Sequence, residues 1–424
     1  MQETRLANGV RVLSETIPTV RSVALGVWVR HGSVHDPAEH QGVSHLLEHM
    51  VFKGTRHRTA REIVAALEGL GGSIDAYTSR EHTGYQARVL DEHLHDALDV
   101  LADLVLAPLL RDEDLELERD VVLEEISTVD ETPDDLVFEL HGDLLWNGHP
   151  YGRSILGTRD TVSAIDGASL RAMHGRQYCG ENLVVAAAGH VEHESFVREV
   201  ERRFGGLPAQ ARVTDVAPAR PAAGRMAHVR HDGVQTHIVL GSPTPGHSDR
   251  RRHALVLLSA AFGGGMSSRL FQRLREELAL GYAVYSYQSF NRGAGVTGMY
   301  LGTRPGWEAR ALGAIRAEYA DLAERGLEPT EFEQIKQQVK GQLLLSLEST
   351  SSRLYRLAGH ALYDEPFRTV DDVLADIDAV DADTLSGVAA EFFAPARQTA
   401  LLLGPEPPGS TAAMEEAWPE LALH

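Results

Sequence analysis

Two stretches of this 424-residue chain match later stretches at a nearly constant spacing. Residues 165–189 align without gaps on residues 380–404, at an offset of 215 positions. Residues 110–125 align on residues 327–342 at an offset of 217. The identities are few, but the order of the helical and strand-like patterns repeats. We therefore expect a duplicated domain.

The length supports this division, because a chain of this size exceeds one ordinary hydrophobic core and predicts two domains of about 200 residues each. The stretch that separates them is rich in Gly, Pro and Ala and lacks periodicity, which is typical of a linker. We predict a first domain over 1–207, a linker over 208–224 and a second domain over 225–424.

The first domain contains the pattern His45-x-x-Glu48-His49. On a helix over 43–52, the spacing i, i+3, i+4 places the three side chains on one face, with the histidines one turn apart. Two such histidines can bind one metal ion, and the Glu can reach a water on that ion without being a ligand. The apolar residues around the trio predict that the helix is largely buried, and buried His and Glu need partners.

A solvated polar helix face is the alternative, since the chain has 21 histidines. A five-residue pattern with three fixed positions seldom arises by chance in one chain, which favours a metal site. Three further histidines, His31, His35 and His40, occupy a predicted loop and are candidate ligands. Without a second spacing constraint, we expect loop histidines to be exposed.

A third ligand must be a carboxylate or another His. Cys179 is the only cysteine, so the chain has neither an intrachain disulfide nor a thiolate cluster, and we expect Cys179 to be structural. A charged helix predicted over 112–130 carries Glu118 and Glu125 seven residues apart, on the same face. The spacing alone does not choose between them.

The duplicated halves differ at these positions. The alignment places Ile335 opposite Glu118 and Gln342 opposite Glu125, and the His-x-x-Glu-His pattern does not recur after residue 224. We infer that one half kept a metal and the other did not.

Charge excludes some functions. A net charge of −21 argues against nucleic-acid binding. Nineteen Asp and Glu but only two Arg, Arg111 and Arg119, lie between residues 91 and 143. They are either solvated helix faces or an acidic field that concentrates basic peptides. The chain has no run of 18 apolar residues and no basic start followed by an apolar segment, so we expect a cytoplasmic protein without a membrane span.

The second half carries Arg275 and Tyr282 after a glycine-rich stretch, 262–268. That stretch lacks the Lys-Ser/Thr of a phosphate-binding loop. From the residues alone, Arg275 reads as an exposed helix residue and Tyr282 as a core residue of a strand.

Taken together, these segments resemble the pitrilysin-like zinc peptidases, or inverzincins, the group of insulin-degrading enzyme and mitochondrial processing peptidase. The likeness covers essentially the whole chain and looks closest to the short bacterial members with two domains. It is carried by the segments HLLEHMVFKGT (45–55), ERDVVLEEI (118–126) and HPYG (149–152).

The resemblance implies a role for each candidate residue. The third zinc ligand follows the second His by about 76 residues, which selects Glu125, and Glu118 supports the metal site from outside the ligand set. Arg275 and Tyr282 would hold the substrate carbonyl and stabilise the oxyanion. Substrate would add as a strand to the sheet edge around 73–78, with Ala76 near its centre.

The resemblance also implies an α+β fold: two duplicated domains, each a mainly antiparallel sheet covered by helices, facing each other as a clamshell. One Zn²⁺ per chain, with Glu48 as general base, would hydrolyse peptides or unfolded segments enclosed in a chamber. Members of this size pair, and a chain with both the metal motif and the Arg/Tyr pair suits a homodimer, with a heterodimer of related subunits as the other arrangement.

Two other functions compete with this hypothesis. One is a non-catalytic scaffold or core subunit, which has no reason to keep Glu48 beside an intact ligand set. The other is a processing-peptidase subunit that requires a different partner chain carrying the Arg/Tyr pair. The presence of Arg275 and Tyr282 in this chain disfavours it.

Overall fold

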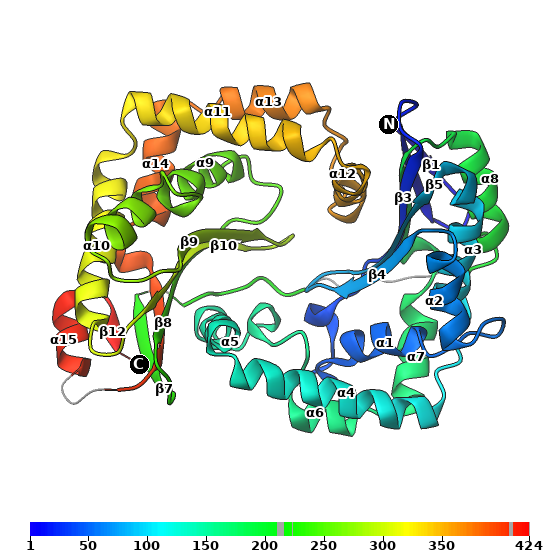
Figure 1. The fold of residues 1–424 in the computed structure, drawn as a ribbon, viewed down its shortest axis with the longest axis horizontal. Helices are drawn as coiled ribbons and strands as arrows, with labels where there is room; N and C mark the ends of the chain where they lie inside the picture. Colours follow the sequence, from blue (N-terminus) through cyan, green and yellow to red (C-terminus); the bar gives the residue numbers. More distant parts are fainter. Residues whose placement is uncertain (210–215, 223, 407–409, 424) are drawn as a thin grey trace. The chain divides into compact units, whose positions relative to one another are not determined.

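The computed structural model describes residues 1–209, 216–222, 224–406 and 410–423. The chain forms two compact units, each built around a six-stranded sheet (Figure 1). Unit 1 comprises Met1–Ser127, Ser154–Val216 and Leu344–Phe367, and unit 2 comprises Thr128–Arg153, Ala217–Leu343 and Arg368–His424.

This division differs from the contiguous domains expected from the sequence. Residues 128–153 belong to unit 2 and residues 344–367 to unit 1, so each unit takes one segment from the other half of the sequence. Within the predicted linker, residues 210–215 and 223 lie outside the described residues.

The sheet of unit 1 has the order β1-β2-β6-β3-β5-β4, in which only β2 and β6 are parallel neighbours. Every residue of β3 after the first is buried, which explains its nearly continuous apolar sequence. The strands are β1 (Gln2–Arg5), β2 (Arg11–Thr16), β3 (Ser22–Val29), β4 (Ser73–Thr78), β5 (Thr83–Leu90) and β6 (Leu183–Gly189).

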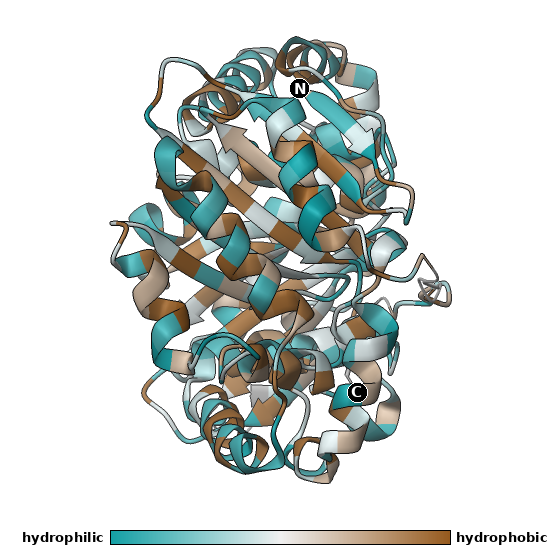
Figure 2. Cartoon of the chain, turned by 90° about the vertical axis from the view of Figure 1, so that its right-hand side faces the viewer, coloured by the Kyte–Doolittle hydropathy of each residue, from teal (hydrophilic) through white to brown (hydrophobic). Residues whose placement is uncertain are grey.

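Helices cover one face of this sheet and form the main core of unit 1 with it. Their amphipathic character appears in Figure 2 as alternating brown and teal along the helical ribbons. They are α1 (Val43–Val51), α2 (Ala60–Glu68), α3 (Leu94–Leu106), α4 (Asp112–Glu131), α6 (Arg159–Ala164), α7 (Gly167–Gln177) and α8 (His193–Phe204).

The opposite face of the sheet is covered by α12 (Thr350–Leu362), which comes from the second half of the sequence. Its buried Leu354, Leu357 and Ala361 pack on strand residues such as Trp28. Arg11 donates from Nη1 to the carbonyl oxygen of Ala361 at 2.8 Å, at the helix C-terminus, where a cation is favourable. These contacts explain why residues 344–367 belong to unit 1.

Unit 2 repeats this plan. Its sheet has the order β12-β7-β11-β8-β10-β9, and α5 packs on one face against buried Val239, Leu401 and Leu403. The elements are β7 (Arg225–Arg230), β8 (Thr236–Thr244), β9 (Val284–Phe290), β10 (Gly295–Thr303), β11 (Thr399–Gly404), β12 (Ala422–Leu423), α5 (Pro133–Trp146), α9 (Arg252–Gly263), the π-helix η6 (Phe271–Glu277), α10 (Glu308–Arg325), α11 (Pro329–Ser346), α13 (Val370–Asp378), α14 (Ala382–Phe392) and α15 (Ser410–Ala417).

The matched segments form matching structures. Asp166 caps α7 by accepting from the backbone N–H of Ser169 at 2.7 Å, and Asp381 caps α14 by accepting from Thr384 at 2.8 Å. Each capped helix leads to a buried strand, β6 or β11. The prediction of two sheet-plus-helix domains is confirmed.

The helices expected over 43–52 and 112–130 are present as α1 and α4. In the described part of the chain, no helix combines the length and apolar character needed to cross a membrane.

Candidate metal centre

The start of helix α1 is fixed by Gly42, the residue that precedes it. Gly42 adopts φ +89°, and a Cβ at this position would lie 2.3 Å from the carbonyl oxygen of Leu156, so only glycine fits. The buried carboxylate of Asp36 accepts from the backbone N–H of Gly42 at 3.0 Å. The helix then buries its apolar residues, such as Leu46 and Met50, and turns the His-Glu-His face away from them.

The structure brings His45 and His49 of α1 together with Glu125 of α4. His45 Nε2 lies 3.7 Å from one carboxylate oxygen of Glu125, and His49 Nε2 lies 3.7 Å from the other. One ligand atom from each residue lies within 4.8 Å of the others, and no second such group of three occurs among the residues described.

This donor set fits zinc. A tetrahedral ion with ligands at about 2.0–2.1 Å holds them roughly 3.3–3.4 Å apart, close to the observed 3.7 Å separations. Burial, and next the neighbouring His49, lower the pKa of His45 to about 4. At neutral pH His45 is therefore uncharged, the form that a metal binds.

Glu118 contacts the site from behind His49. Its side chain is buried, and it accepts from His49 Nδ1 at 3.2 Å. A carboxylate can only accept here, so Nδ1 carries the proton and Nε2 keeps the lone pair that faces Glu125. By contrast, the buried Nδ1 of His45 has no hydrogen-bond partner in the described part of the structure.

Glu48 lies on the same helix face but outside the ligand group. One of its oxygens accepts from Thr78 Oγ1 at 2.7 Å. Burial raises the pKa of Glu48, and the Thr78 hydrogen bond opposes that rise. A carboxylate with a raised pKa is suited to exchange protons near neutral pH.

Strand β4, which ends at Thr78, is an edge strand, because β5 is its only neighbour among the strands of the described residues. The backbone N–H of Ala76 donates to the side chain of Asp75 at 3.0 Å. An edge strand of this kind presents backbone groups to an added strand.

Arg275 and Tyr282 lie in unit 2 and contact each other. The guanidinium of Arg275 stacks 4.3 Å from the ring centroid of Tyr282 and 4.6 Å from that of Phe271. The expectation from the residues alone that Tyr282 is a strand core residue is wrong. Tyr282 precedes β9, and its side chain is 78% exposed.

Local backbone constraints fix this segment. Arg275 belongs to the π-helix η6, a form that often marks functional sites. A Cβ at Gly281 would lie 2.1 Å from the carbonyl oxygen of Gly302, so glycine is required directly before Tyr282.

The loop histidines take no part in the ligand group. The expectation that they are exposed is wrong: His31 is only 6% exposed and stacks on His35 with ring centroids 4.9 Å apart, and His35 and His40 are half-buried. Burial, and next His35, lower the pKa of His31 to about 3.

Two residues that contact the site were missed from the sequence. Thr78, which holds Glu48, comes from a strand 30 positions away and offers no local signal. Lys53 forms an ion pair with Glu118. It lies just past the end of α1, four residues after His49, and this closeness in sequence was a usable signal.

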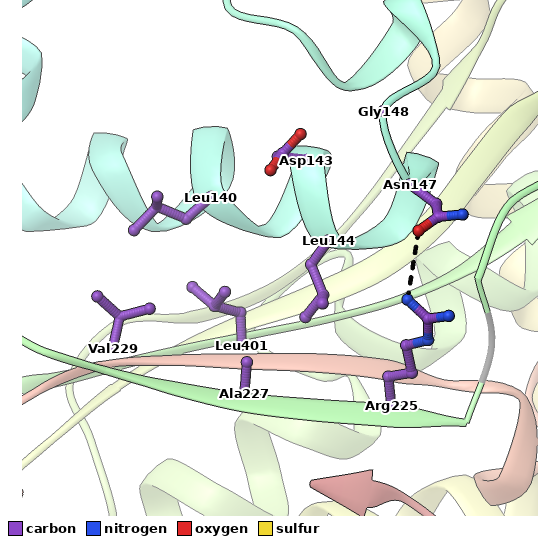
Figure 3. Close-up of a pocket in the computed structure, with 9 residues that line it drawn as sticks. All are labelled: Leu140, Asp143, Leu144, Asn147, Gly148, Arg225, Ala227, Val229 and Leu401. Carbon is purple, nitrogen blue, oxygen red and sulfur yellow. Dashed lines mark hydrogen bonds between the residues drawn. The ribbon is translucent and has the colours of Figure 1, made fainter. Parts of the chain in front are cut away.

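Hollows occur in both units. A hollow of about 540 Å³ in unit 2 lies between α5 and strands β7 and β11, lined by apolar side chains and bordered by an Arg225–Asn147 hydrogen bond of 3.4 Å (Figure 3). A hollow of about 490 Å³ in unit 1 is lined mainly by residues 53–62, which include Lys53. None of the three candidate ligands lines either one.

Comparison with known proteins places the chain in a family. The model of insulinase, peptidase family M16, matches residues 11–159, and that of the peptidase M16 inactive domain matches residues 164–339. The uncharacterized zinc protease YmxG of Bacillus subtilis is 38% identical over 91% of this chain and 94% of its own length. This chain belongs to peptidase family M16.

Other relatives of this M16 chain agree. An uncharacterized zinc protease of Streptomyces coelicolor is 38% identical, over 96% of this chain and 90% of its own length. A Helicobacter pylori protease of known structure has a TM-score of 0.90 at 23% identity, covering 95% of this chain and 99% of that one. A Pseudomonas fluorescens structure described as a peptidase M16 inactive domain also has a TM-score of 0.90, at 20% identity, covering 96% and 98%. These structures support the fold, and the resemblance recognised in the sequence is confirmed.

Proposed function

We propose that this M16 chain is a zinc endopeptidase, holding one Zn²⁺ through His45, His49 and Glu125. The observation that carries the proposal is the convergence of these three side chains beside Glu48, a largely buried carboxylate that is not a ligand. A scaffold would need neither this donor set nor the free carboxylate. The names of the relatives as zinc proteases support the choice of metal.

The chain's residues divide the chemistry among them. A zinc ion held there supplies a Lewis acid that polarises the scissile carbonyl and lowers the pKa of water. Glu48 accepts a proton from the attacking water and delivers it to the leaving amine. Thr78 holds the Glu48 carboxylate in place, and Glu118 holds His49 in the tautomer whose Nε2 is free.

We further propose that the substrate is an extended peptide or unfolded segment that adds as a strand to β4 around Ala76. The edge position of β4 supports this, since main-chain pairing at an edge needs an extended chain. Tyr282 would donate a hydrogen bond to the oxyanion and Arg275 would hold the substrate carbonyl. Tyr282 is exposed enough to meet a substrate.

The acidic stretch 91–143 supports a preference for basic peptides only in part. Its residues divide between the two units at residue 127, and Asp99 and Asp103 already pair with Arg58. If the remaining charge steers substrates, added salt should slow the capture of basic peptides more than that of neutral ones. The same salt dependence for both would leave this stretch as a solvated surface.

The cytoplasmic location, the homodimer, the heterodimer with a related subunit and the clamshell closure stay predictions. They depend on the resemblance or on composition, and a processing subunit with a different partner remains the alternative function.

The central test compares wild type with Glu48→Gln, and with Glu124→Gln as a control that removes an exposed carboxylate next to a ligand. We expect about one zinc per chain in all three proteins. Cleavage of quenched peptides should fall by roughly 10²–10⁴-fold in Glu48→Gln alone, the range for a lost general base. Equal cleavage by wild type and Glu48→Gln would contradict the mechanism.

A further inference from the structure

Lys53 occupies a position that the proposed mechanism does not use. It follows the end of α1, and its ammonium forms an ion pair with Oε1 of Glu118. Its backbone is held as well, because its N–H donates to the Met50 carbonyl at 3.2 Å and its carbonyl accepts from Arg111 at 3.3 Å. The ammonium is therefore presented to Glu118 from a fixed point.

The two oxygens of Glu118 have different partners. Oε1 meets Lys53, whereas Oε2 accepts from His49 Nδ1 at 3.2 Å. The Glu118 side chain is only 8% exposed, so its rotamer is set by these two contacts and by the surrounding packing. Any change in the Lys53 contact alters the orientation of the oxygen that faces His49.

The choice of lysine is unusual for this chain. Of its 40 lysines and arginines only three are lysines: Lys53, Lys336 and Lys340. A guanidinium tends to bind both oxygens of a carboxylate through its planar fork, whereas an ammonium is a compact point charge. A lysine at position 53 thus neutralises Glu118 and leaves Oε2 for the histidine.

The arrangement of charged groups points the same way. Glu48, Glu118 and Glu125 place three carboxyl groups around His45 and His49. Lys53 supplies a cation to Glu118, whose side chain is buried. A buried, unbalanced carboxylate is costly, so the lysine stabilises the arrangement that holds His49.

We propose that Lys53 is a positioning residue of the zinc site, which orients Glu118 through a single contact so that Glu118 fixes the tautomer and direction of His49. The inference rests on the zinc site of the proposed function, but not on peptide cleavage. Lys53 acts through Glu118 and touches neither metal nor substrate.

The first test is the zinc affinity of Lys53→Met, measured by competition with a chromophoric chelator. Methionine keeps the length of the stem and removes the charge, and the hollow beside Lys53 gives room for it. We expect the zinc dissociation constant to rise by about 10–100-fold, the usual cost of losing a partner of a metal ligand. Lys340→Met is the matched control, because Lys340 pairs with Asp378 at 2.7 Å in unit 2, and its zinc affinity should equal that of wild type.

Two further variants distinguish the geometry of the contact between Lys53 and Glu118 from its charge, and from a general loss of stability. Lys53→Arg keeps the charge but offers a two-pronged donor, and we expect its zinc affinity to fall as well. In the Glu118→Gln background, Lys53→Met should cause little additional loss, because the residue through which it acts has already been changed.

Each outcome decides the inference. A dissociation constant for Lys53→Met within twofold of wild type would overturn it, as would an equal loss in Lys340→Met or an undiminished effect in the Glu118→Gln background. Wild-type affinity in Lys53→Arg would overturn the single-contact argument. Zinc binding by wild type without peptide cleavage would instead refute the proposed function and leave the role of Lys53 standing.

Discussion

The two units share a sheet plan and differ in what their helices bury. The order β2-β6-β3-β5-β4 in unit 1 corresponds to β7-β11-β8-β10-β9 in unit 2, each with one parallel pair followed by antiparallel neighbours. At the aligned positions of α4 and α11, Glu118 and Ile335 are both buried. The same buried position thus holds a carboxylate in one unit and an aliphatic side chain in the other.

The fold therefore does not require a charged side chain at this position. Unit 2 fills this position with isoleucine and has the same arrangement in the five corresponding strands. Unit 1 keeps a buried carboxylate that requires two partners, Lys53 and His49, to be tolerated. Burying Glu118 costs unit 1 stability that unit 2, with Ile335, does not lose. We infer that Glu118 serves a function other than stability.

The largest effect on stability should come from placing a carboxylate in unit 2, which lacks counterparts of Lys53 and His49. Ile335→Glu places an unpaired carboxylate in the core of unit 2 and should destabilise it by about 3–5 kcal/mol. Urea unfolding, with hydrogen exchange in β8 and β10 to locate the loss, measures this. Ile335→Leu, a swap that conserves volume, should cost less than about 1.5 kcal/mol. Equal stability of the Glu and Leu variants would show that unit 2 can accommodate the charge.

The aligned pair Glu125 and Gln342 allows an exchange in both directions. Glu125→Gln gives unit 1 the residue of unit 2 and should weaken zinc binding by more than about 100-fold, because losing a ligand costs more than losing a ligand's partner. Gln342→Glu should create no second site, since the His-x-x-Glu-His pattern does not recur in the second half of the sequence. Zinc content and chelator competition report both results. A second zinc in Gln342→Glu would contradict the division of roles.

A substitution at Tyr282 tests whether unit 2, which lacks the ligand residues, contributes to the proposed peptide hydrolysis. Tyr282→Phe should lower kcat by roughly 100-fold, at the low end of the loss for an oxyanion donor, with zinc content unchanged. Tyr285→Phe is the control, because Tyr285 is also exposed and close by on β9. If kcat were the same in wild type and Tyr282→Phe, the proposed role of this hydroxyl would be discarded.

The smallest expected difference is the response to acid. Burial lowers the pKa of His31 to about 3 and of His82 and His45 to about 4 in unit 1, whereas among the described residues of unit 2 burial lowers the pKa of His141 alone as far, to about 4. These histidines stay neutral when folded but take up a proton near pH 6.5 when unfolded, so stability is lost as pH falls below about 6.5.

At pH 6 each buried neutral histidine costs roughly 0.8 kcal/mol relative to high pH. With two more of them, zinc-free unit 1 should lose roughly 1.6 kcal/mol more than unit 2 through these groups between pH 8 and pH 6. Hydrogen exchange in β3 and β8 compares the units directly. Equal losses in the two strands would mean that other groups control acid sensitivity.

Local patterns predicted the local parts of the structure. The spacing of His45, Glu48 and His49 gave the helix and its polar face, and the capped segments at Asp166 and Asp381 gave the duplication, because both signals lie within a few turns of chain. The choice of Glu125 needed the family resemblance, since two carboxylates shared one helix face. The Thr78 contact and the burial of His31 could not be predicted, because both depend on strands paired in three dimensions.

The expected contiguous domains differ from the two units for a related reason. The sequence of α12 does not indicate which sheet its apolar face will cover. The linker-like composition near residue 208 predicted a single boundary between two contiguous domains. The Arg11 contact with the end of α12 joins residues 350 positions apart. Such a pairing has no local signature.

The crossed positions of α5 and α12 also have a consequence for biosynthesis. The strands of unit 1 are all translated by Gly189, but the helix that covers their second face is finished only at Leu362. At about 5–20 residues per second, the ribosome needs roughly 9–35 seconds to cross that interval. During this time Trp28 and its neighbours lack their partner helix, so nascent chains shortened before residue 350 should bind chaperones through that face and full-length chains should release them.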